Sequence, residues 1–123
     1  MEVRDFSSRL QRLASTLRRR HSLSRFDLSH DRRSDAIELA DVEVPRHLRK
    51  QGVGSRVMGI LTKFADKHKK RIWLHTGEKN SLSGTTSRGR LVKFYRVHGF
   101  VPNKGKRKDY ALSRFASMYR NPK

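Results

Sequence analysis

Apolar and polar residues follow two different periods along the first third of the chain. From Phe6 to Leu17 the apolar residues recur at helical spacing, which predicts one amphipathic helix. We interpret the opening residues 1–5 as a short strand. Residues 24–30 alternate as a half-buried strand does, and the turn-like run 31–35 predicts a hairpin to a second strand over 36–44.

A glycine-bearing turn follows Pro45, and a second helical pattern begins after it. The apolar positions from Val53 to Ala65 predict a helix over 53–68, and the apolar run 71–76 predicts a short buried strand. A strand, a loop, a helix and another strand in this order are typical of a parallel crossover. The fold class is therefore predicted to be α/β or α+β.

The remaining segments are shorter. Residues 76–90 are rich in Gly, Ser and Thr without periodicity, so they are predicted to form a flexible loop. Residues 91–97 favour a short helix, and a strand restarts at 100–101. After a turn at 103–106, a final strand is expected near Tyr110.

Length and composition limit what these elements can build. The chain has 123 residues, 34% of them hydrophobic, which suits a single domain over 1–123 with one modest core. It lacks the run of about 20 apolar residues that crosses a bilayer, so we expect a cytoplasmic protein without a membrane partner. Because it has no cysteine, disulfides, thiolate metal sites and cysteine nucleophiles are excluded.

Charge indicates a class of partner. Thirty Lys and Arg residues against eleven Asp and Glu give a formal net charge of +19, which attracts polyanions such as nucleic acid or an acidic protein. A merely hydrated surface is the simpler interpretation. The sequence has neither an aromatic RNA-recognition motif nor zinc-finger spacing, so base-specific recognition is not predicted.

The glycine turn before the predicted helix 53–68 is a candidate anion site. Gly52 and Gly54 let the backbone approach a phosphate at a helix N-terminus, and Arg49 or Arg56 can add positive charge. The turn is not a Walker loop, because no Gly-Lys-Ser/Thr closes it, and it lacks the third glycine of the dinucleotide fingerprint. Two glycines before a helix are also common in an ordinary tight turn.

Two motifs carry a resemblance to a known family. The segment Val44–Ser55, VPRHLRKQGVGS, resembles the Arg/Gln-x-x-Gly-x-Gly/Ala motif of the GNAT acyltransferase superfamily. The later segment Leu91–Phe100, LVKFYRVHGF, is similar to the family's signature with a tyrosine shortly before Gly-Phe. The resemblance spans about 36–101 and implies a GNAT-like mixed central sheet flanked by helices, here with a shortened amino-terminal half.

The resemblance implies an N-acetyltransferase that uses acetyl-coenzyme A as co-substrate. It would move the acetyl group to a primary amine by direct attack within a ternary complex. The backbone amides of the glycine turn would hold the pyrophosphate, and the end of the preceding strand would pair with the pantetheine arm. The residues implied in coenzyme binding are Glu43, Val44, Arg49, Lys50, Gln51, Gly52, Val53, Gly54, Ser55, Arg56 and Ser87.

Ser87 is included because family members often have an asparagine facing the coenzyme shortly before the tyrosine. This chain has Thr86-Ser87-Arg88 in that region, so a hydroxyl or a guanidinium would have to replace the amide.

The resemblance places Tyr95 at the thioester sulfur, where a phenol can protonate the departing thiolate. Without the Gly99-Phe100 context, ordinary aromatic packing would be favoured for Tyr95. The candidate general bases are Glu43, Asp41, Glu38, His75 and His98. Glu43 is preferred because it directly precedes the turn; the alternative is a salt bridge to one of the many arginines. Histidine and acid spacing indicate no metal site.

Two further hypotheses remain open at this stage. The chain could be a basic nucleic-acid-binding protein that kept a GNAT fold without catalysis. Catalysis and binding could also combine, with the positive charge bringing the enzyme to an amine on a nucleic acid or on a protein bound to it. The acceptor is not fixed by the sequence, and the apolar strands allow but do not establish a homodimer.

Overall fold

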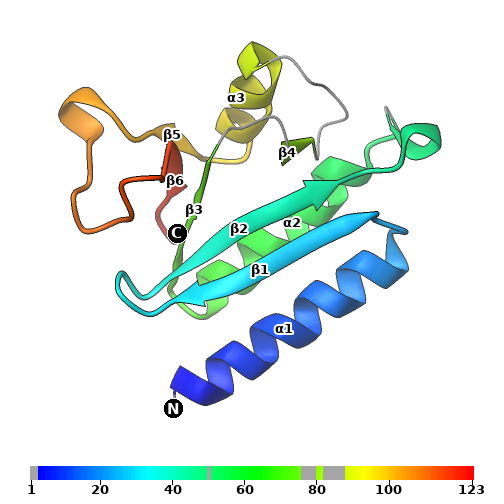
Figure 1. Cartoon of the computed structure of the whole chain (residues 1–123), viewed down its shortest axis with the longest axis horizontal. Helices are drawn as coiled ribbons and strands as arrows, with labels where there is room; N and C mark the ends of the chain where they lie inside the picture. Colours follow the sequence, from blue (N-terminus) through cyan, green and yellow to red (C-terminus); the bar gives the residue numbers. More distant parts are fainter. Residues whose placement is uncertain (1–2, 50, 76–79, 82–87) are drawn as a thin grey trace.

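Three helices and a mixed six-stranded sheet make up the part of the chain that the structure describes (Figure 1). The computed structural model describes residues 3–49, 51–75, 80–81 and 88–123. In chain order the elements are α1 (Val3–Arg20), β1 (Arg25–Asp31), β2 (Ala36–Glu43), the 3-10 turn η1 (Arg46–Leu48), α2 (Val53–Lys67), β3 (Arg71–Leu74), β4 (Asn80–Ser81), α3 (Arg88–Val97), β5 (Val101–Pro102), the 3-10 turn η2 (Gly105–Arg107) and β6 (Met118–Arg120).

The sheet has the order β1-β2-β3-β6-β5, and β4 pairs with β2 outside this path. The β1–β2 hairpin is antiparallel, and β2 and β3 are parallel with α2 as the crossover between them. Strand β6 inserts between β3 and β5 and is antiparallel to both. The predicted mixed sheet, the hairpin and the parallel crossover are therefore confirmed.

Alternation along the strands divides the sheet into two faces. Ile37 and Leu39 of β2, with Ile72 and Leu74 of β3, join the large core cluster that also contains buried residues of all three helices. Trp73 points to the other face. It packs there in a smaller cluster with Ala36, Leu112, Ala116 and Tyr119. The second face is therefore covered in part by the segment between β5 and β6.

Helix α1 begins earlier than the sequence pattern predicted. Residues 3–5, interpreted above as part of a strand, belong to its first turn, so that prediction is wrong. Asp5 suits the positive N-terminal end of the helix and pairs with Arg9 one turn later, at 3.3 Å. The predicted apolar face is confirmed, because Phe6, Leu10 and Leu17 are buried.

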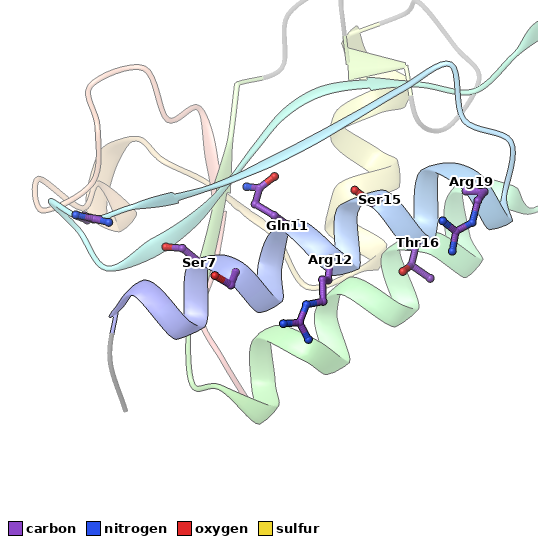
Figure 2. Close-up of a pocket in the computed structure, with 8 residues that line it drawn as sticks. Ser7, Gln11, Arg12, Ser15, Thr16 and Arg19 are labelled. Carbon is purple, nitrogen blue, oxygen red and sulfur yellow. The ribbon is translucent and has the colours of Figure 1, made fainter.

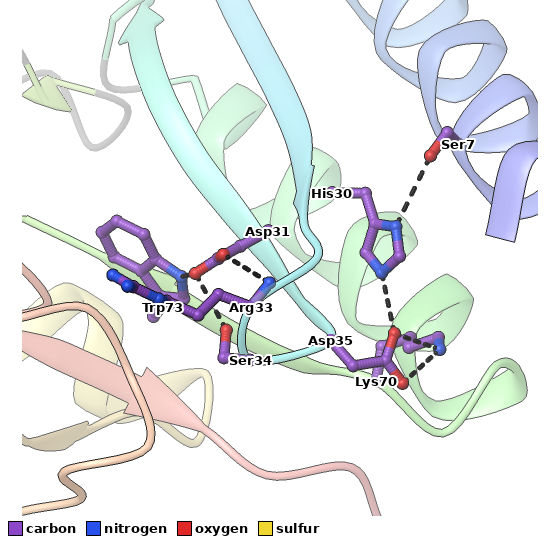
Figure 3. A network of polar contacts seen from close by, with 8 residues as sticks. All are labelled: Ser7, His30, Asp31, Arg33, Ser34, Asp35, Lys70 and Trp73. Carbon is purple, nitrogen blue, oxygen red and sulfur yellow. Dashed lines mark hydrogen bonds and ion pairs between the residues drawn. The ribbon is translucent and has the colours of Figure 1, made fainter.

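A network of polar contacts joins the hairpin turn to β3 and to the end of α2 (Figure 3). The Trp73 indole N–H donates to Asp31 at 3.1 Å, and the Ser34 hydroxyl donates to the same carboxylate at 2.9 Å. On the other side, Lys70 donates to both oxygens of Asp35, at 2.7 and 2.8 Å, and these bonds hold the pKa of the Asp35 carboxyl below its usual value. The turn is thus fixed in place.

The final strand is not where it was predicted. Tyr110 lies in a turn and is 86% exposed, and the last strand is β6, at Met118–Arg120. The Asp109 carboxylate causes this turn, because it accepts the Ala111 backbone N–H at 2.9 Å and forms an ion pair with Arg71 on β3. A turn closed in this way cannot continue as a strand.

The predicted loop over 76–90 lies mostly outside the described residues. Within it, Asn80–Ser81 forms β4, and α3 begins at Arg88 rather than at 91. The predicted helix over 53–68 is confirmed as α2, and the strand over 71–76 is confirmed as the shorter β3. Among the described residues, no helix has the length and apolar character needed to cross a membrane.

Candidate active site

The end of β2 and the start of α2 form the first part of the site. After Glu43 the chain passes through η1 and reaches Gly52, the N-cap of α2, whose φ of 77° lies in the left-handed region. The first bond of the helix runs from the Arg56 N–H to the Gly52 carbonyl at 3.1 Å. The amides of the first three helical residues precede that bond, so they are directed out of the helix end, where an anion can accept them.

Glycine is needed at position 52 for two reasons. A left-handed backbone costs any residue with a Cβ about 1 kcal/mol. A Cβ there would also lie 3.3 Å from Arg56 Nη1, which donates to the Gln51 carbonyl at 3.1 Å. The guanidinium of Arg56 therefore lies directly beside the helix N-terminus.

Two predicted coenzyme ligands hold the turn together through their side chains. Arg49 Nε donates to the Val44 carbonyl at 2.8 Å, and Gln51 Nε2 donates to the His47 carbonyl at 3.0 Å. These contacts give the turn a defined shape before any ligand binds. The predicted ligand Lys50 lies outside the described residues.

Glu43 and Val44 lie where β2 leaves the sheet. Val44 is buried in the large core cluster, and Glu43 is half-buried with its carbonyl accepting the Ser24 N–H at 3.0 Å. The Glu43 carboxylate forms no ion pair within the described part of the chain. Strand β3 pairs with β2 only as far as Leu39. Beyond that point β4 pairs with β2, at Val42 and Glu43.

Tyr95 is fully buried on α3, and its hydroxyl has no hydrogen-bond partner among the described residues. Its ring makes edge contacts with Phe94 and Phe100, at centroid distances of 5.3 and 5.5 Å. Burial raises the pKa of the phenol far above its ordinary value, so the group remains a proton donor at neutral pH. A buried, unpaired hydroxyl is costly, and a bound ligand is one way to satisfy it.

Tyr95 shares its core cluster with the other half of the site. The same cluster contains Val42 and Val44, which flank Glu43, and Val53 at the start of α2. The Leu91 side chain, one turn before Tyr95, is also part of it. The predicted acid, the predicted base strand and the anion turn are thus joined through one packed core.

The structure separates the other candidate bases. Glu38 points to the opposite sheet face, beside Trp73, and accepts the Ser29 hydroxyl at 3.3 Å. His75 is exposed, with Nδ1 3.1 Å from the Phe115 carbonyl oxygen. Burial and then Arg120 lower the pKa of the half-buried His98. The side chain of Asp41 and all of Ser87 lie outside the description.

Arg120 is a residue that sequence reasoning missed. It is 5% exposed, donates to the His98 carbonyl at 3.1 Å and forms two bonds to the Asp66 carboxylate, at 2.8 and 3.0 Å. It therefore ties the end of α3, which carries Tyr95, to α2. The sequence carries no signal for this role, because the burial of Arg120 in β6 and its partner Asp66 are set by packing; once buried, a guanidinium needs such a partner.

Comparison with known proteins agrees with the arrangement of these elements. The model of the acetyltransferase (GNAT) family matches residues 17–100, which include β1, β2, the glycine turn, α2, β3 and Tyr95. No curated protein matches the chain. Within the described residues, no group of three or more acidic or histidine side chains could bind a metal ion. With about two thirds of its length matched, the chain belongs to the acetyltransferase (GNAT) family.

Proposed function

We propose that this protein transfers the acetyl group of acetyl-coenzyme A to a primary amine, by direct attack of the amine in a ternary complex. Use of acetyl-coenzyme A as co-substrate is general to the family. The observation that supports the finer proposal is the buried Tyr95 hydroxyl without a partner, in the same core as the start of α2.

In the proposed reaction the amine nitrogen attacks the thioester carbonyl carbon, and the carbon–sulfur bond then breaks. The Tyr95 phenol gives its proton to the departing sulfur; its buried hydroxyl is protonated at neutral pH and has no other partner among the described residues. The attacking nitrogen loses a proton to the Glu43 carboxylate, directly or through water. The products are the amide and free coenzyme A.

The pyrophosphate of the substrate would lie on the amides of Val53, Gly54 and Ser55, with Arg56 beside them. The pantetheine arm would use the edge of β2 at Glu43 and Val44. Because β4 pairs with Val42 and Glu43 on that edge, the arm and β4 compete for it. Binding in this pose requires β4 to leave.

The partner proposed for the acceptor side is a polyanion, because the net charge of +19 attracts nucleic acid or an acidic protein. Such a partner would carry the amine or bring it near. We also propose a cytoplasmic location for this chemistry, on the grounds of the sequence composition alone.

Calorimetric titration of acetyl-coenzyme A tests the proposal. Ser55 is exposed in the first turn of α2, so Ser55→Glu places a carboxylate at the proposed pyrophosphate site while suiting the helix dipole. We expect binding to weaken about tenfold or more. Gly54→Glu also places a carboxylate beside the proposed pyrophosphate site. Because Gly54 is buried, that side chain would disturb the packing as well as the ligand.

The matched control is Gly59→Glu, the same new charge in the middle of the same helix, where a Cβ meets nothing within 4 Å. It should leave binding within about twofold of the wild type. Equal losses in the two variants, or no saturable binding by folded wild-type protein, would refute the proposed coenzyme site.

A further inference from the structure

An open groove of about 900 Å³ lies on the sheet face opposite the large core. One wall is the turn of the β1–β2 hairpin, the floor is the row Ser29, Glu38 and Trp73 across three paired strands, and the other wall is the segment 110–115. Its charged and aromatic lining residues are His30, Asp31, Arg32, Arg33, Glu38, Trp73, Tyr110, Arg114 and Phe115. None of these belongs to the candidate active site at the start of α2.

The segment from Asn103 to Ala116 is firmly anchored. The buried Asn103 amide donates to the Ala116 carbonyl at 2.9 Å and accepts the Asp109 N–H at 2.7 Å. The Tyr119 hydroxyl donates to the Arg107 carbonyl at 2.7 Å, and Asp109 forms its ion pair with Arg71. The position of this segment is therefore set by contacts with β3 and β6.

Within this anchored segment the smaller apolar side chains point inward and the rings point outward. Leu112 and Ala116 are buried against Trp73, whereas Tyr110 is 86% and Phe115 is 61% exposed. The interior is already filled, so neither ring has a place in the core. Each ring carries a cation on its face: Lys108 Nζ lies 5.8 Å from the Tyr110 centroid, and the Arg114 guanidinium lies 5.0 Å from that of Phe115.

We propose that this groove binds single-stranded nucleic acid, with Tyr110 and Phe115 stacking on bases and Arg33 and Arg114 contacting phosphates. The inference rests on the polyanionic partner proposed above and gives it a surface and a chemical class. A single strand offers a charged backbone and unpaired flat bases together, which matches exposed rings interleaved with cations. A duplex hides its base faces, and an acidic polypeptide has charge without a series of planar faces.

The carboxylates on the groove floor fit the same ligand. They repel phosphates, which keeps the backbone at the arginine-lined rim, and a carboxylate can accept an N–H from the edge of an unpaired base, such as the N3–H of thymine. Asp31 already accepts side-chain hydrogen bonds from both Trp73 and Ser34, whereas Glu38 accepts one, from Ser29, so Glu38 has the greater capacity left for a base. The groove thus separates a phosphate-binding rim from a base-binding interior.

Fluorescence anisotropy with a labelled oligothymidylate of about 15 nucleotides tests the proposal without acetyl-coenzyme A. The double variant Tyr110→Leu/Phe115→Leu keeps the charge and should weaken binding about tenfold or more, with the salt dependence unchanged. Val97→Ala, which alters another exposed apolar residue on α3, is the control and should have no effect. Urea unfolding checks that each variant is folded.

A second pair of variants separates the groove from overall charge. Arg33→Gln/Arg114→Gln removes two cations from the groove, and Arg12→Gln/Arg19→Gln removes two from the open polar groove along α1 (Figure 2). Arg32 lines both grooves and stays unchanged. The affinity for oligothymidylate should fall much more in the first double variant than in the second. The first should also show a weaker dependence of the binding constant on salt concentration, because it makes fewer phosphate contacts.

The possible results are distinct. Equal losses from the two arginine pairs, full binding by the ring variant, or equal affinity for a duplex would overturn the groove while leaving a polyanionic partner in place. Competition by polyglutamate as strong as by oligothymidylate would assign the partner to acidic proteins instead. Absence of any binding by folded wild type would refute the nucleic-acid partner itself, whatever the outcome with acetyl-coenzyme A.

Discussion

The start of α2 and the groove beside Trp73 are two candidate binding regions built in opposite ways. The first consists of neighbouring residues, Glu43 to Arg56, whose shape follows from a glycine turn and a helix N-terminus. The second brings together the hairpin turn and Trp73, which meet through the pairing of β2 with β3, and the segment 110–115, which reaches them because β6 inserts between β3 and β5. Local sequence therefore encodes the first region, and topology creates the second.

If the regions are independent, hydroxyl removal should act differently in each. Tyr95→Phe deletes an unpaired buried hydroxyl, so turnover should fall about 100-fold while stability stays the same or rises by about 1 kcal/mol. Tyr119→Phe deletes a hydroxyl that donates to the Arg107 carbonyl, so stability should fall by about 1 kcal/mol with turnover unchanged. Thiol release with small primary amines and urea unfolding measure the two effects.

A strong loss of stability in Tyr95→Phe would contradict the catalytic assignment, since the Tyr95 hydroxyl would then have a structural role. The comparison would also break if Tyr119→Phe reduced turnover by itself.

The ion pair between Asp66, near the end of α2, and Arg120 of β6 lies outside both regions and gives the next largest effect. Bonds from Arg120 lower the pKa of the Asp66 carboxyl in the folded protein. The stability it contributes is therefore present above the unfolded pKa of about 3.9 and is lost as pH falls through the lowered folded value. Asp66→Asn should cost about 2 to 3 kcal/mol at neutral pH, because Arg120 is buried.

Urea unfolding between about pH 2 and 7 checks this, and Asp66→Asn should flatten the acid side of the curve. Asp109→Asn is the comparison on the groove side. Its carboxyl pKa is lowered first by the Ala111 backbone N–H and then by Arg71. A curve for Asp66→Asn with the wild-type acid slope would contradict the assignment.

Gly52, in the first region, and Gly59, further along α2, should respond to alanine with opposite signs. Gly52→Ala forces a Cβ into a left-handed backbone beside Arg56, so it should destabilise the protein by about 1 kcal/mol and weaken acetyl-coenzyme A binding. Gly59→Ala adds a Cβ inside α2 with nothing within 4 Å, so it should stabilise by about 0.5 to 1 kcal/mol. Thermal unfolding and calorimetry measure both.

The smallest expected effect concerns the edge of β2. Ser81 pairs with Glu43, and Ser81→Pro should disrupt the pairing because proline removes a backbone donor. If β4 competes with the pantetheine arm, acetyl-coenzyme A should bind about two- to fivefold more tightly to the variant. Unchanged or weaker binding would mean that β4 does not oppose the ligand.

Sequence predicted the regions with long, strong periodicity. The apolar spacing of α2 and the glycine turn before it located both elements, the two-residue period located β1, and the turn after β1 indicated β2. It failed where tertiary contacts decide. Residues 3–5 form the first turn of α1, where Asp5 suits the helix N-terminus and pairs with Arg9, and Tyr110 is exposed because the Asp109 carboxylate closes a turn beside it.

The candidate site divides in the same way. The anion turn and Tyr95 were identified from contiguous motifs, but the unpaired state of the Tyr95 hydroxyl is a property of packing. Arg120, which holds the end of α3, depends on a partner 54 residues earlier in the chain, and no local pattern reports that distance. The groove beside Trp73 has the same origin.

The insertion of β6 also imposes an order on the protein's synthesis. The hairpin, α2 and β3 are complete once residues 25–74 have been made, yet the edge of β3 gains its partner only when residues 118–120 follow. Until then a short hydrophobic strand, Ile72-Trp73-Leu74, has an edge of unpaired backbone groups with which another chain can pair. Slow translation of residues 75–117 would therefore prolong the aggregation-prone stage.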